Sequence, residues 1–205
     1  MFSFDLAMQN LIEDIIENCA YFQHVDLGRV AISVKPSKVS GLDGVYAQIF
    51  PLRYKNGAFS GVEKVGNRLE RYRVDPVYRG RREMLYILYF YLPRFFNLSF
   101  IEKMTTIFHE LYHISPEFNG DLRRFPGKNF MHGVSVGKYD SLMTALAKDY
   151  LFRTSSLEKS DFLRFGSRSV EKRYGKLLYS RLPEPSAFYV GRVHSKKRGT
   201  RKKGG

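Results

Sequence analysis

Apolar residues recur at helical spacing in several separate stretches of this chain. In the clearest of them the repeated positions are Ile101, Met104, Phe108 and Leu111. Ser99 and Glu102 form an S-x-x-E capping box at the start of this stretch. Pro116 ends it, because the residue before a proline is pushed out of helical geometry. The pattern predicts a helix from about Ser99 to Ile114.

Four other segments show a helical pattern of varying strength. An amphipathic repeat predicts an N-terminal packing helix from Phe4 to about Ala20, and a second predicts a helix from Tyr139 to Phe152. Weaker patterns over Leu157–Phe165 and Val170–Leu178 predict two short helices near the end of the chain.

Between the predicted helices Phe4–Ala20 and Ser99–Ile114, the spacing of apolar residues changes to that of β-strands. Arg29–Val34 and Val45–Leu52 are rich in β-branched and aromatic residues, and the turn residues Gly41–Gly44 separate them, so we expect two antiparallel strands. The aromatic run Glu83–Tyr91 predicts a buried strand.

The segment between these strands is more polar. Lys55-Asn56-Gly57 has the residues that a tight hairpin turn prefers. Ala58–Val74 fits either a weak third strand, such as Arg68–Val74, or a loop over one face. Together the patterns indicate an α+β fold, with an N-terminal helix, a small antiparallel or mixed sheet, a central helix and further C-terminal helices.

Length and composition favour one domain with a tail. The chain has 205 residues, of which 43% are hydrophobic, enough for one sizeable core. We expect a single domain over residues 1–190 and a disordered basic tail over residues 191–205.

Three features of the sequence bear on the compartment of the protein. Cys19 is the single cysteine, so it cannot form an internal disulfide. The first residues include Asp5, where a signal peptide would be basic, and the apolar run Met84–Leu92 is too short for a membrane helix. These features predict a cytoplasmic protein with no membrane partner, and they leave its oligomeric state open.

The tail carries half of the net charge of +14. The cations of its last fourteen residues, which include no acid, are Arg192, Lys196, Lys197, Arg198, Arg201, Lys202 and Lys203. Such a segment has too little apolar material to fold. It is either a nonspecific anchor to nucleic acid or a solubilising terminus.

The predicted central helix contains HELYH, an instance of the HExxH signature, at residues 109–113. Residues four apart share one face of a helix, so His109 and His113 can present both imidazoles to one metal ion, with Glu110 beside them. Two imidazoles and a carboxylate without a partner would be costly in so apolar a helix. We therefore interpret the cluster as a zinc site rather than as a hydrogen-bonded core cluster, with Glu110 as the catalytic general base.

A catalytic zinc usually takes three protein ligands, so a third donor is needed. His132 is our choice, because it is the first histidine after the motif and follows a loop long enough to fold back. Asp121 and Asp140 are the alternatives, and either could instead orient a histidine. Two other histidines, His24 and His194, are assigned no metal role.

Two tyrosines and two arginines in or near the motif have side chains that could take part in chemistry. Tyr112 and Tyr139 could steady an oxyanion, but the chain has 14 tyrosines and packing explains them better. Arg123 and Arg124 could pair with Asp121 or hold a substrate carboxylate, and a solvated loop is the simpler account.

Four segments carry a resemblance to a known family. They are HVDLGRVAISV, YAQIFPLRY, REMLYILYFYLPRFF and FHELYHISPEFNGDLRRFPGKNFMHG, within about residues 24–150. Together they resemble a family of predicted metallopeptidases from phages and uncharacterised bacterial proteins, related in plan to the SprT-like zincins. The resemblance implies a minimal zincin-like fold, His109 and His113 as zinc ligands, His132 as the third, and Glu110 as general base. SprT-like proteases act on proteins bound to DNA, a setting that the basic tail would suit.

The expected function is therefore that of a zinc-dependent metallopeptidase, which hydrolyses peptide bonds of a protein or peptide substrate with a metal-activated water. A nucleic-acid-binding protein with a structural or vestigial metal site is the alternative, and an inactive zincin scaffold is a third reading.

Overall fold

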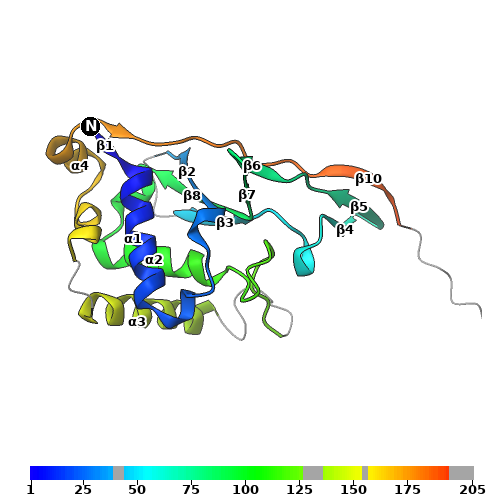
Figure 1. Ribbon diagram of the computed structural model, residues 1–205, viewed down its shortest axis with the longest axis horizontal. Coiled ribbons are helices and arrows are strands. Elements are labelled where there is room, and N and C mark those ends of the chain that lie inside the picture. The colour runs from blue at the N-terminus through cyan, green and yellow to red at the C-terminus, as the bar shows by residue number, and fades with distance from the viewer. Residues whose placement is uncertain (39–43, 127–135, 154–156, 194–205) are drawn as a thin grey trace, which may run out of the picture.

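A three-stranded mixed sheet lies at the centre of the molecule (Figure 1). The structure, a computed structural model, describes residues 1–38, 44–126, 136–153 and 157–193. The sheet consists of β2 (Val30–Pro36), β8 (Tyr86–Leu92) and β3 (Ala47–Pro51), in the order β2-β8-β3. β8 is parallel to β2 and antiparallel to β3. The α+β class is confirmed, and the sheet is mixed.

The first two predicted strands run antiparallel to each other, as expected, but they do not pair directly. Both strands exist close to their expected bounds, but β8 lies between them and pairs with each. The reason is in the sequence of β8, YILYFYL, which is almost entirely buried. A strand that is apolar on both faces is favoured at the centre of a sheet, where both of its edges are paired and both faces are covered.

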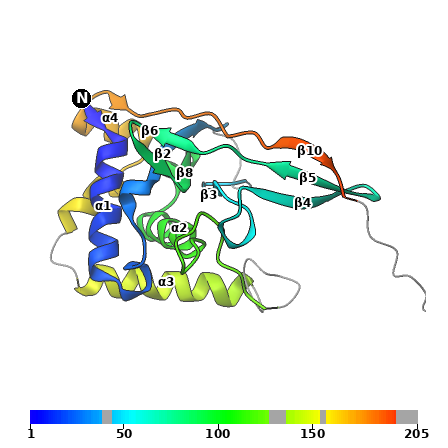
Figure 2. The same cartoon turned by 45° about the vertical axis from the view of Figure 1, so that its right-hand side comes forward.

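Helices α1 (Phe4–Asn18) and α2 (Phe100–Tyr112) lie on one face of this sheet, and α3 (Val136–Arg153) packs against α2 in a further layer (Figures 1 and 2). All three match the predicted helices to within a few residues. One apolar cluster joins them to the sheet, and its members include Phe4, Met8, Leu11, Leu88, Phe90, Met104, Phe108, Met143 and Tyr150.

A smaller cluster lies on the other face of the sheet, formed by Ala31, Leu52, Met84, Ile87 and Tyr89. The chain returns along this side after its last helix. Ser33 Oγ donates to the carbonyl of Ser180 at 3.3 Å and accepts from the N–H of Leu182 at 2.8 Å, and the Tyr89 hydroxyl donates to the carbonyl of Pro183 at 3.0 Å. The C-terminal segment is thereby fixed to the domain.

A second three-stranded sheet projects away from the helices as an arm (Figure 2). It is antiparallel, with the order β10 (Phe188–Arg192), β5 (Arg68–Arg73) and β4 (Ser60–Val65). The predicted tight turn precedes it as η3 (Lys55–Gly57), where Asn56 and Gly57 have φ of 59° and 75°. The weak strand expected within Arg68–Val74 is confirmed, whereas β4 and β10 were not predicted.

The remaining elements are short. They are β1 (Phe2–Ser3), η1 (Ala20–Phe22), η2 (Leu27–Arg29), β6 (Val77–Arg79), β7 (Arg82–Met84), η4 (Arg94–Asn97), η5 (Leu157–Arg164), α4 (Ser167–Tyr174) and β9 (Leu177–Leu178). The helices predicted over Leu157–Phe165 and Val170–Leu178 correspond to η5 and α4, except that residues 177–178 form β9. Within the described ranges, no helix has the length and apolar character needed to cross a membrane. The predicted start of the disordered tail at residue 191 is wrong, because Gly191 and Arg192 belong to β10 and pair with β5. Residues 194–205 lie outside the described residues, so disorder there stays a prediction.

Candidate metal centre

Helix α2 begins with the capping box that its sequence predicts. Ser99 Oγ accepts a hydrogen bond from the N–H of Glu102 at 3.4 Å, and Glu102 Oε2 accepts one from the N–H of Ser99 at 2.8 Å. The helix runs to Tyr112, and His113 caps its C-terminus. This fixed start sets the register that places His109 and His113 on the same face, one turn apart.

The two histidines direct their Nε2 atoms at each other. His109 Nε2 and His113 Nε2 are 3.0 Å apart, and the rings are inclined by 74°. Two nitrogen ligands of one tetrahedral zinc ion stand about 3.3 Å apart. The donor set and its convergence therefore fit a zinc ion, for which imidazole nitrogen is a preferred ligand.

The other ring nitrogen of each histidine faces a residue at the start of α3. Asp140 Oδ1 lies 3.1 Å from His109 Nδ1, and the Tyr139 hydroxyl lies 3.4 Å from His113 Nδ1. The Tyr139 ring also stacks on His113, with centroids 5.3 Å apart and planes inclined by 21°. An oxygen at Nδ1 favours the tautomer that leaves Nε2 free to bind a metal. Consecutive residues of α3 thus orient both candidate ligands.

Glu110 lies next to His109 but is almost fully buried, with 8% of its surface exposed. Its Oε2 accepts a hydrogen bond from the backbone N–H of Ile49 on β3 at 2.7 Å. Burial raises the pKa of Glu110 to about 8, and the bond from Ile49 opposes this shift. A carboxyl group with a pKa near neutrality can both accept and donate a proton at physiological pH.

His109, Glu110 and Asp140 line a cavity of about 620 Å³ between α2, α3 and the start of β3. Its lining also includes Thr105, Thr106, Thr144 and the segment 44–47. Within the described ranges β3 is an edge strand on this side, because β8 occupies only one of its edges. The Ile49 N–H points away from β8, toward Glu110. Backbone groups alternate in direction along a strand, so Ala47, two residues earlier, also directs its N–H and C=O away from β8 and toward the cavity.

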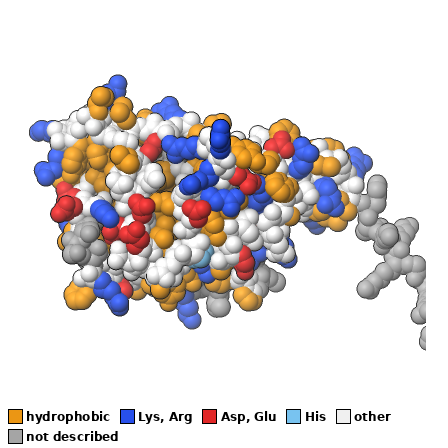
Figure 3. Space-filling model, viewed as in Figure 1, with side chains coloured by type: hydrophobic (Ala, Val, Ile, Leu, Met, Phe, Trp, Pro, Cys, Tyr) orange, Lys and Arg blue, Asp and Glu red, His pale blue; other side chains and the backbone are white. Residues whose placement is uncertain are grey.

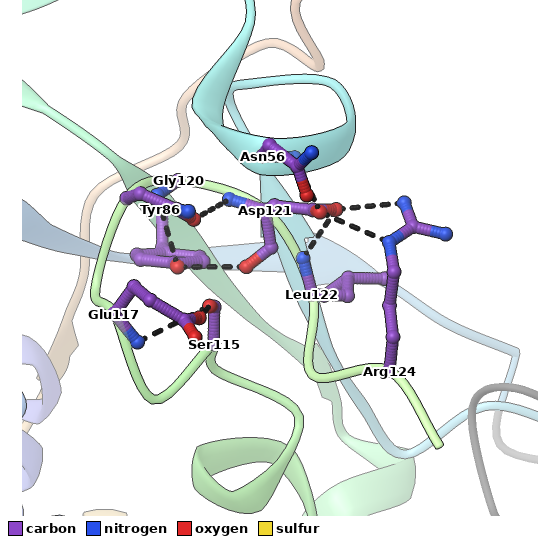
Figure 4. A network of polar contacts seen from close by, with 9 residues as sticks. Asn56, Tyr86, Ser115, Glu117, Gly120, Asp121, Leu122 and Arg124 are labelled. Carbon is purple, nitrogen blue, oxygen red and sulfur yellow. Dashed lines mark hydrogen bonds and ion pairs between the residues drawn. The ribbon is translucent and has the colours of Figure 1, made fainter. Parts of the chain in front are cut away.

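The carboxylate of Asp121, one candidate for the third ligand, accepts hydrogen bonds from neighbouring residues instead (Figure 4). Asp121 is buried, and its carboxylate accepts bonds from Arg124 at 2.8 and 2.9 Å and from the N–H groups of Asn56 and Leu122 at 3.0 and 2.8 Å. Burial alone would raise its pKa, but these bonds outweigh it and lower the pKa. For Arg124 the simpler account, a solvated loop, is therefore wrong, because this residue pairs with Asp121. The carboxylate of Asp121 is already bound by these neighbouring groups.

Tyr86 holds this loop against the sheet. Its hydroxyl accepts from the N–H of Gly120 at 3.0 Å and donates to the carbonyl of Asp121 at 2.7 Å (Figure 4). Gly120 has φ of 87°, and an added Cβ would lie 2.6 Å from Arg53 Cγ, so glycine is required there.

Asp140 and His132 are the other two candidates for the third ligand. Asp140 contacts His109 at Nδ1, the nitrogen on the far side of the ring from Nε2, so it orients this histidine. His132 lies outside the described residues, and its role as third ligand stays a prediction. Among the residues that the structure does describe, no three His, Cys, Asp or Glu side chains form a group that could hold a metal ion.

Two features of the site were not predicted. One is the Ile49 N–H that binds Glu110, which no sequence pattern could reveal because the contact joins a backbone group to a helix 61 residues away. The other is the pair Thr105 and Thr106, whose position three to five residues before Glu110 and His109 could have suggested a polar stripe facing the cavity. Arg123 donates to the carbonyl of Tyr112 at 2.7 Å and lies over its ring, a packing role for both.

Comparison of the chain with protein-family models, with curated proteins and with solved structures returned no match.

Proposed function

We propose that this protein is a zinc-dependent metallopeptidase of the HExxH type. The observation that supports this most directly is the 3.0 Å approach of His109 Nε2 to His113 Nε2, with the Glu110 carboxylate on the next residue. In the proposal His109, His113 and His132 hold the ion. A zinc ion, when bound, supplies Lewis acidity that polarises a peptide carbonyl and makes water more acidic.

Glu110 is the proton carrier of the proposed reaction. Its carboxylate accepts the proton of the attacking water and passes it to the leaving amine nitrogen, so that the carboxyl group returns to its starting state. The bond from Ile49 N–H fixes one carboxylate oxygen, Oε2, and orients the group. Asp140 and Tyr139 orient the imidazoles of His109 and His113 through contacts with their Nδ1 atoms.

The free edge of β3 offers a place for the substrate backbone. An extended peptide can add as a further strand and pair with the N–H and C=O of Ala47, and this places its carbonyl groups along the cavity that His109 and Glu110 line. Binding through backbone groups predicts loose sequence preference.

Metal content and hydrolysis of the purified full-length chain test the proposal together. Elemental mass spectrometry should find about one zinc per chain in the parent protein, and much less in His109→Ala and His132→Ala. A quenched-fluorescence peptide library should be cleaved by the parent protein. Glu110→Gln should keep its zinc and lose at least about a hundredfold in rate, since it removes the general base.

Glu13→Gln, at an exposed glutamate of α1, is the matched control and should retain both properties. Zinc binding without cleavage in the parent protein would support a structural metal site, the alternative function. Cleavage by Glu110→Gln at the parental rate would overturn the assigned base.

A further inference from the structure

In the part of the chain that the structure describes, no layer packs over most of the arm formed by β4, β5 and β10. Val62, Leu69, Phe188 and Tyr189 are between 42% and 55% exposed, although apolar and aromatic strand residues are normally covered. Figure 3 shows hydrophobic, Lys and Arg side chains intermingled on this projecting part of the molecule. The arm is therefore a surface available to a partner.

Strand register sorts the arm's side chains into two faces. Cross-strand partners point to the same side of a sheet, and neighbours along a strand point to opposite sides. The pairs Val62 with Arg71, Lys64 with Leu69, and Phe188 with Arg73 share one side. We call the surface made by these six residues the cationic face. It combines three cations with three apolar side chains and contains no acid.

The opposite face has a different character. It carries both acids of the three strands, Glu63 and Glu70, together with the cations Arg68 and Arg192. Tyr72 donates to Glu70 at 2.8 Å and packs against Tyr189. This face is electrically balanced and internally bonded.

The cations of the cationic face are available for binding. Within the strands Lys64, Arg71 and Arg73 face no carboxylate, and the pair of Arg73 with Asp75 joins two side chains that are both more than half exposed, so it contributes little. Arg71 and Arg73 stand about 7 Å apart on one strand. Phe188, opposite Arg73, provides an exposed aromatic ring next to them.

This combination suits single-stranded nucleic acid better than other partners. Phosphates match a row of cations, and unpaired bases stack on exposed aromatic rings, whereas a duplex hides its base faces. A second copy of the chain would bring like charges together. The sequence after β10 adds six more Lys and Arg residues, which raises the attraction for any polyanion at this end of the molecule.

We propose that the cationic face of the arm, centred on Lys64, Arg71, Arg73 and Phe188, binds single-stranded nucleic acid. The contact is to phosphates through the three cations and to a base through the ring, without sequence readout. This surface is separate from the candidate metal centre and does not depend on the proposed hydrolase activity.

Paired charge variants of the full-length chain test the proposal. Arg71→Gln with Arg73→Gln removes two charges from the cationic face, and Arg68→Gln with Arg192→Gln removes two from the opposite face. Affinity for a fluorescent 20-residue oligothymidylate is measured by anisotropy at several salt concentrations. The first variant should bind at least about tenfold more weakly and lose about 1.4 from its salt slope, because each phosphate contact contributes about 0.7. The second should bind within about threefold of the parent.

A matched pair of aromatic variants and a crosslinking experiment test the role of the ring and the location of the contact. Phe188→Ser should weaken binding of the oligonucleotide, whereas Tyr189→Ser should not. Circular dichroism checks that all variants fold. Photocrosslinking with a bromouridine oligonucleotide should label residues 69–73 or Phe188. Equal losses in both charge variants, tighter binding of a duplex of the same length, or equal binding of polyglutamate would each overturn the proposal.

Discussion

Asp140 Oδ1 lies 3.1 Å from Nδ1 of His109, on the side of the ring away from His113. The two residues come from different helices, and the contact depends on the packing of α3 against α2. In the proposed metal site this carboxylate accepts the Nδ1–H of His109, so that the lone pair of Nε2 is the one directed at the ion.

Removal of this carboxylate should weaken metal binding without removing a ligand. Asp140→Asn should raise the dissociation constant for zinc by about 10- to 100-fold, the range seen when partners of ligating histidines are lost. Competition with a chromophoric chelator measures the constant. Asp149→Asn, at an exposed carboxylate of the same helix, should leave it unchanged. Parental zinc affinity in Asp140→Asn would show that Asp140 does not orient the ligand.

Tyr139 should contribute mainly through its ring. Tyr139 is 5% exposed and its ring stacks on His113, while the contacts of its hydroxyl with the carbonyl of His109 and with His113 Nδ1 are long, at 3.4 Å. Tyr139→Phe should therefore keep the stability of the parent to within about 1 kcal/mol. Tyr139→Ala should lose about 3–5 kcal/mol, as is usual for truncation of a buried aromatic side chain. Urea denaturation compares the three proteins, and equal losses in both variants would show that the hydroxyl, not the ring, is important.

The helices and the two motif histidines could be predicted from the sequence because their signals are local. The box formed by Ser99 and Glu102 fixes the start of α2, and an apolar stripe then defines its register through His113. This spacing places both imidazoles on one face of the helix, within reach of each other.

The sheet order and the contacts around the histidines depend on long-range packing instead. β2 pairs with a strand more than fifty residues later, and Asp140 is 31 residues from His109, so no local pattern specifies either relationship. Two strands of the arm, β4 and β10, were missed for another reason. Both faces of β4 and β10 are solvated, and their sequences therefore lack the alternation of apolar and polar residues that reveals a half-buried strand.

Gly120 should be sensitive to a single added methyl group. At φ of 87° an alanine is strained, and its Cβ would meet Arg53, which is buried and paired with Glu83. Gly120→Ala should lower the free energy of unfolding by about 2–3 kcal/mol. Gly66→Ala has similar strain, at φ of 59°, but no heavy atom lies within 4 Å of its Cβ, so about 1 kcal/mol is expected. Equal losses would mean that the Arg53 side chain moves aside.

Lys103 should make stability depend on pH in the alkaline range. It is 2% exposed, and its Nζ donates to the carbonyls of Leu163 and Phe165 at 2.9 and 3.0 Å. Burial lowers its pKa from 10.5 to about 8. Between these two values the unfolded chain binds more protons than the native one, so the native state gains stability as pH rises from about 8 to 10.5.

The difference in unfolding free energy between the parent and Lys103→Met isolates this effect, because other titrating groups are common to both proteins. It should shift in favour of the parent by up to about 3 kcal/mol between pH 7.5 and 10.5. Urea denaturation at a series of pH values gives the two curves, and Lys148→Met, at an exposed lysine of α3, should run parallel to the parent. A constant difference between the parent and Lys103→Met over this range would mean that the ammonium keeps its ordinary pKa. In that case the two carbonyl oxygens would compensate for the water that Lys103 loses on folding.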